Sequence, residues 1–187
     1  MSAIEIAAVL LGLANVTLVV RRSVWNYPFG IVMVVLYAWI FFHAKLYSDA
    51  LLQLFFFVIQ IYGWAHWLRF REAGGEVRVE RLDARQRLAW FAGTAAAAAG
   101  WGALMHAYTD AAFPWWDATE AGLSVAAQLL MSRRYVENWV LWIVVDVVSI
   151  GLYLAKGLLP TAGLYLVFLL LSIWGLARWL RAARAVA

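Results

Sequence analysis

Two acidic residues stand inside long apolar stretches of this chain. Asp146 lies near the middle of the apolar run 139–154, and Glu120 lies in the run 115–131. An ionised carboxylate is costly in hydrocarbon, so each acid must face a cavity or a partner. A lysine or a tryptophan N–H would be a structural partner, whereas a cavity would indicate a bound solute. Both acids are therefore the first candidates for a functional role.

Polar and aromatic residues share helical faces with these acids. Five positions in and beside the run 139–154 recur at steps of four, four, three and four, which places them on one face of a helix. They are Asn138, Trp142, Asp146, Ser149 and Tyr153, with Trp139 beside them. The runs 115–131, 50–68 and 27–42 add further positions. The expected lining of a central cavity is Asn138, Trp139, Trp142, Asp146, Glu120, Ser124, Gln128, Gln53, Gln60 and Tyr37.

These residue types select a class of solute. Tryptophan rings stack on flat rings and attract cations, amide side chains bond hydroxyls and amides, and carboxylates offset positive charge. The lining favours a solute that is small, planar, cationic, and hydroxylated or amide-bearing. For the glutamines a hydrogen bond between helices is an equal alternative. Tryptophans at the ends of apolar runs, such as Trp115 and Trp179, are interpreted as anchors at the membrane surface.

The composition is that of an integral membrane protein. Of the 187 residues, 66% are hydrophobic and only 14% are charged, which is far from the usage of a soluble domain. The net charge of +4 does not indicate a nucleic-acid partner, because the arginines flank apolar runs and mark topology. The chain has no cysteine, no pair of histidines at metal-binding spacing and no hydrolase or nucleotide-binding motif. We therefore expect no enzymatic activity, no metal site and no cofactor.

Seven apolar runs approach the length of about 20 residues that a helix needs to cross the hydrocarbon. They cover 4–20, 27–42, 50–68, 88–106, 115–131, 139–154 and 161–180. Thirteen arginines fall on one side of this arrangement, and only Lys45 and Lys156 fall on the other. Because cytoplasmic loops are rich in lysine and arginine, the N-terminus is predicted outside and the C-terminus in the cytoplasm, in a bacterial inner membrane. No basic segment precedes the run 4–20, which is interpreted as a retained span.

The chain repeats itself at an offset of 112 residues. Among the matching pairs are Arg21-Arg22 with Arg133-Arg134, Asn26 with Asn138, Gly63 with Gly175, and Trp67-Leu68 with Trp179-Leu180. A doubled apolar unit is typical of transporters built from two halves. At the register of Trp142 and Asp146, the first copy has Gly30 and Val34. Specificity is therefore expected to lie mainly in the second copy.

We predict one domain over 1–187 that is all-α and crosses the membrane seven times. It would contain a first repeat at about 1–68, a cytoplasmic linker at 69–87, a spacer helix at 88–106 and a second repeat at about 114–180. Three helices alone would invert the second copy, and the spacer helix restores its direction. The predicted plan is a parallel three-plus-one-plus-three repeat.

The chain resembles the PnuC family of bacterial vitamin transporters, best known for nicotinamide riboside. The most specific stretch is ENWVLWIVVD at 137–146. Further similar stretches lie at 36–38, 45–53, 62–64, 152–153, 156–157, 161–162 and 164–165. The resemblance covers nearly the whole chain and weakens over the linker and the spacer helix.

The resemblance implies a fold similar in plan to the SWEET sugar transporters, with uptake by facilitated diffusion and alternating access. It implies substrate contacts from the second-repeat residues Asn138, Trp139, Trp142 and Asp146, and from Gln53, Tyr37 and Gln60 of the first repeat. Thiamine and riboflavin stay open as alternative solutes, because relatives in the family carry them. A membrane scaffold or accessory subunit without its own solute is the alternative of another class. The expected partners are the vitamin and the lipid bilayer, and homo-oligomerisation stays open.

Overall fold

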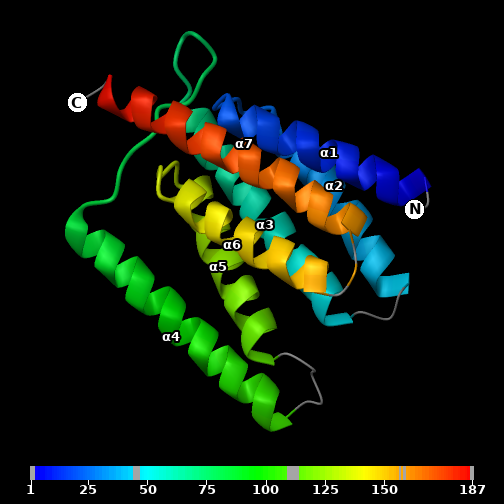
Figure 1. The fold of residues 1–187 in the computed structure, drawn as a ribbon. Coiled ribbons are helices and arrows are strands. Elements are labelled where there is room, and N and C mark those ends of the chain that lie inside the picture. Colours follow the sequence, from blue (N-terminus) through cyan, green and yellow to red (C-terminus); the bar gives the residue numbers. More distant parts are fainter. Residues whose placement is uncertain (1–2, 44–46, 109–113, 156, 158, 186–187) are drawn as a thin grey trace. The chain divides into compact units, whose positions relative to one another are not determined.

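The protein is all-helical in a computed structural model, which describes residues 3–43, 47–108, 114–155, 157 and 159–185. The described residues form seven α-helices (Figure 1). Their bounds are α1 Ala3–Val20, α2 Asn26–His43, α3 Tyr47–Arg69, α4 Ala84–Tyr108, α5 Pro114–Ser132, α6 Asn138–Ala155 and α7 Leu159–Arg184. Each predicted apolar run corresponds to one helix, so the predicted helical architecture is confirmed.

The helix α4 begins one turn earlier than its apolar run. Gln86 N–H donates to Asp83 Oδ1 at 2.8 Å, and Asp83 N–H donates to Gln86 Oε1 at 3.0 Å. This reciprocal pair is a capping box, which satisfies free N–H groups at a helix start. The linker between α3 and α4 therefore covers 70–83, and the predicted end at 87 was wrong by about one turn.

Five of the described helices are long and apolar enough to cross a membrane. They are α2, α3 from Ala50 onward, α4, α6 and α7. The apolar part of α1 is shorter, at Ile6–Val20. The helix α5 is not among the five, and Asp117, Glu120 and Gln128 interrupt its apolar residues. That all seven helices cross the membrane stays a prediction.

The chain forms two compact units, of which the first comprises Met1–Val79, Ser132–Arg134 and Ala177–Ala187. Within it, α1 packs against α2 and α2 against α3 (Figure 1). The last turns of α7 belong to this unit. The indole N–H of Trp179 donates to the carbonyl of Val19 at 3.0 Å, and its ring centroid lies 5.8 Å from that of Trp67. Both tryptophans are fully buried, so neither anchors at the membrane surface.

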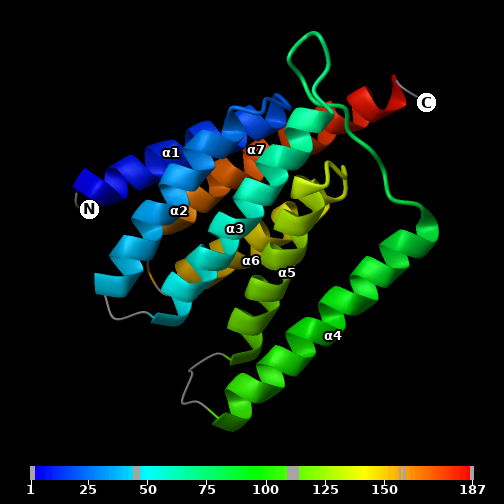
Figure 2. The ribbon, with the colours of Figure 1, turned by 180° about the vertical axis from the view of Figure 1, so that it is seen from behind.

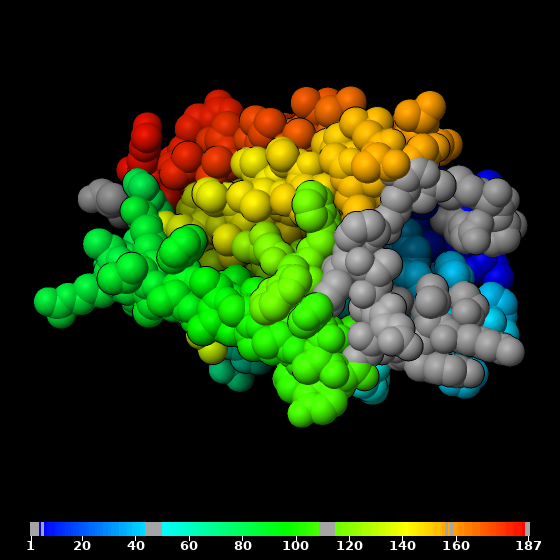
Figure 3. Space-filling model, turned by 60° about the horizontal axis from the view of Figure 1, so that its bottom comes forward, coloured from blue at the N-terminus to red at the C-terminus, as the bar shows by residue number. Residues whose placement is uncertain are grey.

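The second unit comprises Glu80–Met131 and Tyr135–Leu176, with α4, α5, α6 and most of α7. The helices α4 and α5 run in opposite directions (Figure 2). They meet at small residues, since a Cβ built on Gly122 would lie 3.1 Å from Ala98 Cβ and one on Gly102 would lie 2.5 Å from the Trp115 ring. Elsewhere α4 lies at the surface of its unit (Figure 3), with Phe91 74% exposed. A Cβ built on Gly93 or Gly100 of α4 would meet nothing within 4 Å.

The turn between the first and second helix is built alike in both repeats. Arg22 and Arg134 have left-handed backbones, with φ of 56° and 69°. Ser23 N–H donates to the Leu18 carbonyl and Tyr135 N–H to the Leu130 carbonyl, each at 3.0 Å. This closure follows a left-handed residue at a helix end, where glycine is usual. Two arginines at equivalent strained positions indicate that their side chains compensate for the strain.

The two turn arginines hold the linker in the first unit by its backbone. Arg22 Nη1 donates to the Val77 carbonyl at 3.3 Å, and Arg134 Nη1 donates to the Arg78 carbonyl at 2.7 Å. The Arg134 guanidinium also lies over the Phe70 ring, 3.6 Å from its centroid. Glu76 pairs with Arg22 and with Arg178. The linker residues 70–79 are therefore held as part of the first unit.

An aromatic ring on a glycine joins the second and third helix of each repeat. A Cβ built on Gly63 would lie 2.5 Å from Tyr27 Oη, and one on Gly175 would lie 2.5 Å from the Trp139 ring. Tyr27 and Trp139 occupy the same register in the two repeats, as do the two glycines. Both rings are buried. Because real Cβ atoms do not approach so closely, only glycine allows this helix spacing.

Replacing Gly175 with alanine should destabilise the protein by about 1–3 kcal/mol, the usual cost of overpacking a close contact. The added methyl group would collide with the rigid Trp139 ring. Thermal unfolding of the purified protein in detergent measures the loss.

Gly163→Ala is the matched control on the same helix, since a Cβ at Gly163 would meet nothing within 4 Å. Equal melting temperatures for the two variants would show that the ring does not rest on Gly175.

Candidate functional site

The polar face of α6 points inward, as predicted. Asn138, Asp146 and Ser149 are buried, and Trp142 and Tyr153 are half-buried. The opposite side carries Val140, Val144 and Val147, which are 41–54% exposed. The apolar side of α6 is therefore exposed, and the residues able to bind a solute face the interior of their unit.

Asp146 is held by a serine from the next helix. Ser172 Oγ on α7 donates to Asp146 Oδ2 at 2.9 Å, and both residues are buried, at 3% and 4% exposure. A hydroxyl donor stabilises the carboxylate without neutralising its charge. The acid therefore keeps a defined orientation at the middle of α6.

Glu120 is held in the same way one turn further along α6. Ser149 Oγ donates to Glu120 Oε1 on α5 at 2.6 Å. The Tyr165 hydroxyl interacts with Ser149 and Tyr153, and the two tyrosine rings lie 5.3 Å apart at 30°. Three helices of the second unit thus contribute to one polar network.

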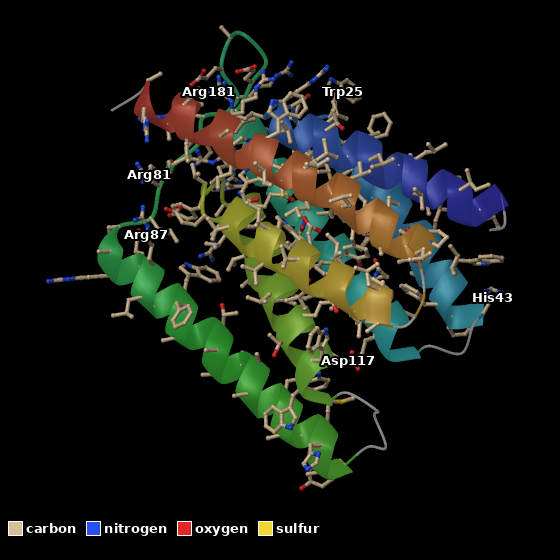
Figure 4. The ribbon with its side chains drawn as sticks, viewed as in Figure 1. Trp25, His43, Arg81, Arg87, Asp117 and Arg181 are labelled. Atoms are coloured by element: carbon tan, nitrogen blue, oxygen red, sulfur yellow. The ribbon has the colours of Figure 1, made fainter. Side chains whose placement is uncertain are left out.

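Asp117 lies apart from this network. Asp117 stands in the first turn of α5 and is exposed (Figure 4). Figure 4 also labels Arg87, which stands at the start of α4. A carboxylate at a helix N-terminus interacts favourably with the free N–H groups there. Asp117 is therefore an exposed acid at the start of α5.

Asn138 and Trp139 make structural contacts that their equivalents in the first repeat also make. Asn138 Nδ2 donates to the Tyr135 carbonyl at 2.6 Å, and Asn26 Nδ2 donates to the Ser23 carbonyl at 2.7 Å. Trp139 is 1% exposed and rests on Gly175. These contacts occupy the amide donor of Asn138 and one face of the Trp139 ring. Binding of a solute by either residue stays a prediction.

The remaining α5 candidates differ in burial. Gln128 is 6% exposed, and its Nε2 has no hydrogen-bond partner among the described residues. Ser124 is half-buried. An amide donor left without a partner costs free energy unless a ligand or water satisfies it. Gln128 is therefore the stronger of these two candidates.

In the first unit, Gln60 fills the space beside a glycine. A Cβ built on Gly30 would collide with Gln60 Nε2 and would lie 2.7 Å from Asn15 Nδ2. Gln60 is 4% exposed, and its Oε1 has no hydrogen-bond partner in the described part of the chain. Asn15 Nδ2 donates to the Asn26 carbonyl at 2.7 Å. The amide of Gln60 thus lies in a polar cluster inside its own repeat.

Gln53 and Tyr37 are half-buried in the same unit. The Tyr37 ring stacks on Phe41 one turn away, with centroids 5.8 Å apart. Nothing in these contacts joins either residue to the Gln60 cluster. Their role in binding stays a prediction.

Two partners of the acids, Ser172 and Tyr165, were not among the predicted site residues. Each is the main polar side chain of its stretch of α7, so neither belongs to a series of polar residues at helical spacing. The repeat did contain a signal, because Ser172 stands at the register of Gln60 and Tyr165 at that of Gln53. Extending the first-repeat candidates by 112 residues would have found both.

This arrangement of side chains is suited to binding a solute. Two carboxylates and several hydroxyls and amides can bond a solute or balance its charge, and Trp142 offers a ring one turn from Asp146. Among the described residues there is no group of three or more His, Cys, Asp or Glu that could hold a metal ion.

The chain is similar to characterised transporters over nearly its whole length. The sequence profile of a family described as "Nicotinamide mononucleotide transporter" matches residues 2–181. The nicotinamide riboside transporter PnuC of Escherichia coli is 30% identical over 98% of this chain and 87% of its own length. The riboflavin/roseoflavin transporter RibM of Streptomyces davaonensis is 31% identical over 91% of this chain and 81% of its own length.

A solved structure has the same fold. The crystal structure of the vitamin B3 transporter PnuC matches with a TM-score of 0.81 and 28% identity, over 97% of this chain and 82% of that one. The resemblance found in the sequence motifs is thus confirmed along the chain and in three dimensions. The chain belongs to the nicotinamide mononucleotide transporter family, which is a family of transporters that includes PnuC and not a family of enzymes.

Proposed function

We propose that this multi-pass membrane transporter carries nicotinamide riboside. The observation that carries the proposal is the inward face of α6, where the Asp146 carboxylate is held one turn from Trp142. A carboxylate and an indole ring suit a cationic, planar solute. The whole-length similarity to PnuC of Escherichia coli supports the same solute.

The proposed binding residues divide into two groups. Trp142, Asp146, Glu120, Ser124 and Gln128 would form the specific part of the site in the second repeat. Gln53, Tyr37 and Gln60 would contribute from the first repeat. Asn138 and Trp139 would act close to the solute mainly by holding α6 in place, given their cap and glycine contacts.

The architecture we propose is a parallel three-plus-one-plus-three repeat of the kind found in SWEET transporters. The duplicated turns at Arg22 and Arg134 and the duplicated aromatic–glycine contacts support it. Three helices per repeat, with α4 as spacer, give the two repeats the same direction. Alternating access between the repeats would then move the solute by facilitated diffusion.

The proposed location is a bacterial inner membrane, with the N-terminus outside and the C-terminus in the cytoplasm. The arginines of the 70–83 linker, of both turns and of the end of α7 would lie on the cytoplasmic side.

Riboflavin is the second candidate solute, because RibM is 31% identical to this chain over most of its length. Thiamine is a third candidate, since it is cationic and planar like nicotinamide riboside. A scaffold without a solute would bind none of the three.

Calorimetric titration of the purified protein with nicotinamide riboside, thiamine and riboflavin, side by side, should show the tightest binding for nicotinamide riboside. Tighter binding of either other vitamin would replace the proposed solute. Absence of heat with all three would favour the scaffold.

Trp142→Ala should weaken binding of nicotinamide riboside about 5- to 30-fold, the effect of losing one aromatic contact with a cation. Trp174→Ala removes an indole that is 41% exposed on α7 and serves as control. The same titration measures both, and equal losses would remove Trp142 from the site.

Single-cysteine labelling should establish the orientation, because the natural chain has no cysteine. A membrane-impermeant maleimide should label Ala107→Cys, at the end of α4, in intact cells. Gly74→Cys, in the linker, should react only after the membrane is opened. The reverse pattern would place the arginine-rich side outside.

A further inference from the structure

Asp146 and Glu120 each receive a hydrogen bond from a serine on a different helix. Ser172 of α7 bonds Asp146 of α6, and Ser149 of α6 bonds Glu120 of α5. The ion pairs found among the described residues join Arg22 with Glu76, Arg178 with Glu76, and Arg87 with Glu137. Neither Asp146 nor Glu120 takes part in one. Each acid is thus oriented by a serine hydroxyl and has no ion-pair partner among the described residues.

At the positions of Asp146 and Glu120, only the second repeat has an acid. At the register of Asp146 the first repeat has Val34, and at the register of Glu120 it has Ala8. Both are buried and apolar. A repeat of this fold can therefore be built with apolar residues at these two positions.

Ser172 fixes one of the two Asp146 oxygens. It donates to Oδ2, and no hydrogen bond from another described residue reaches Oδ1. A carboxylate held through one oxygen presents the other in a fixed direction, which lowers the ordering cost of binding. Trp142, one helical turn away on the same face, would attract the same positive charge.

We propose that Ser172 positions the Asp146 carboxylate, and that the carboxylate held in this way makes the site select cationic ring solutes over neutral ones of the same shape. The inference rests on the proposed function, since it needs a solute in this site. It adds a residue and a selection rule: a quaternary ring nitrogen is favoured, and a neutral ring is not.

The matched pair of solutes is nicotinamide riboside and its dihydro form, which keep one skeleton but differ in ring charge. The wild-type protein should bind the cation more tightly. Asp146→Asn should weaken binding of the cation about 10- to 100-fold and binding of the neutral form much less, since bonds to a charged group contribute most. Glu72→Gln, which removes a negative charge from the exposed linker, is the control.

Ser172→Ala should weaken binding of the cation about three- to tenfold and reduce the ratio of the two affinities, because one hydrogen bond to the carboxylate is lost. Ser172→Thr keeps the hydroxyl and should restore the ratio. Thr17→Val removes a hydroxyl that bonds only its own helix, at the Leu13 carbonyl, and should change neither affinity. Melting temperatures check that the variants are folded.

The outcomes separate the two proposals. If the wild-type protein binds neither form, the proposed function fails. If it binds both forms equally, the transporter stands and the selection rule is overturned. If Ser172→Ala weakens both forms by the same factor, Ser172 is a packing residue and does not position the acid.

Discussion

The contact between a large ring and a glycine governs how the helices of each repeat assemble. Tyr27 on Gly63 and Trp139 on Gly175 bring the second and third helix together at one allowed register. The polar contacts of each repeat lie a turn or two from this point. Gly30 and Gln60 are each three residues from the first contact, and Ser172 is three residues from the second. A shift of either helix pair would therefore separate the groups that define the candidate site.

Although both repeats share this ring-on-glycine contact, they place large and small side chains at opposite positions of the neighbouring helix pair. The first places a large amide, Gln60, against a glycine, Gly30. At the same register the second has the small Ser172 and the large Trp142. The first repeat fills its interior with its own side chain, whereas the second presents a ring, a hydroxyl and a carboxylate. Two similar helical bundles can thus differ in the chemistry they offer while keeping similar packing.

Much of the fold was predictable from the sequence, because hydrophobic runs of membrane length define helices with little ambiguity. The inward face of α6 followed from its periodicity, and the end of the linker at Asp83 could have been found from the D-x-x-Q capping pattern. The choice of partners was not predictable from local sequence. That Ser172 bonds Asp146, or that Trp139 rests on Gly175, depends on how α6 and α7 pack. The roles of Asn138 and Trp139 in the turn and the core were equally hidden, since their residue types suit both packing and binding.

The turn arginines hold the linker by main-chain atoms, and this has an evolutionary consequence. Arg22 and Arg134 donate to the carbonyls of Val77 and Arg78, which every amino acid provides. These two bonds therefore do not depend on the side chains of the residues that accept them. Conservation in this part of the family should lie in the arginines of the turns and not in the chain they hold.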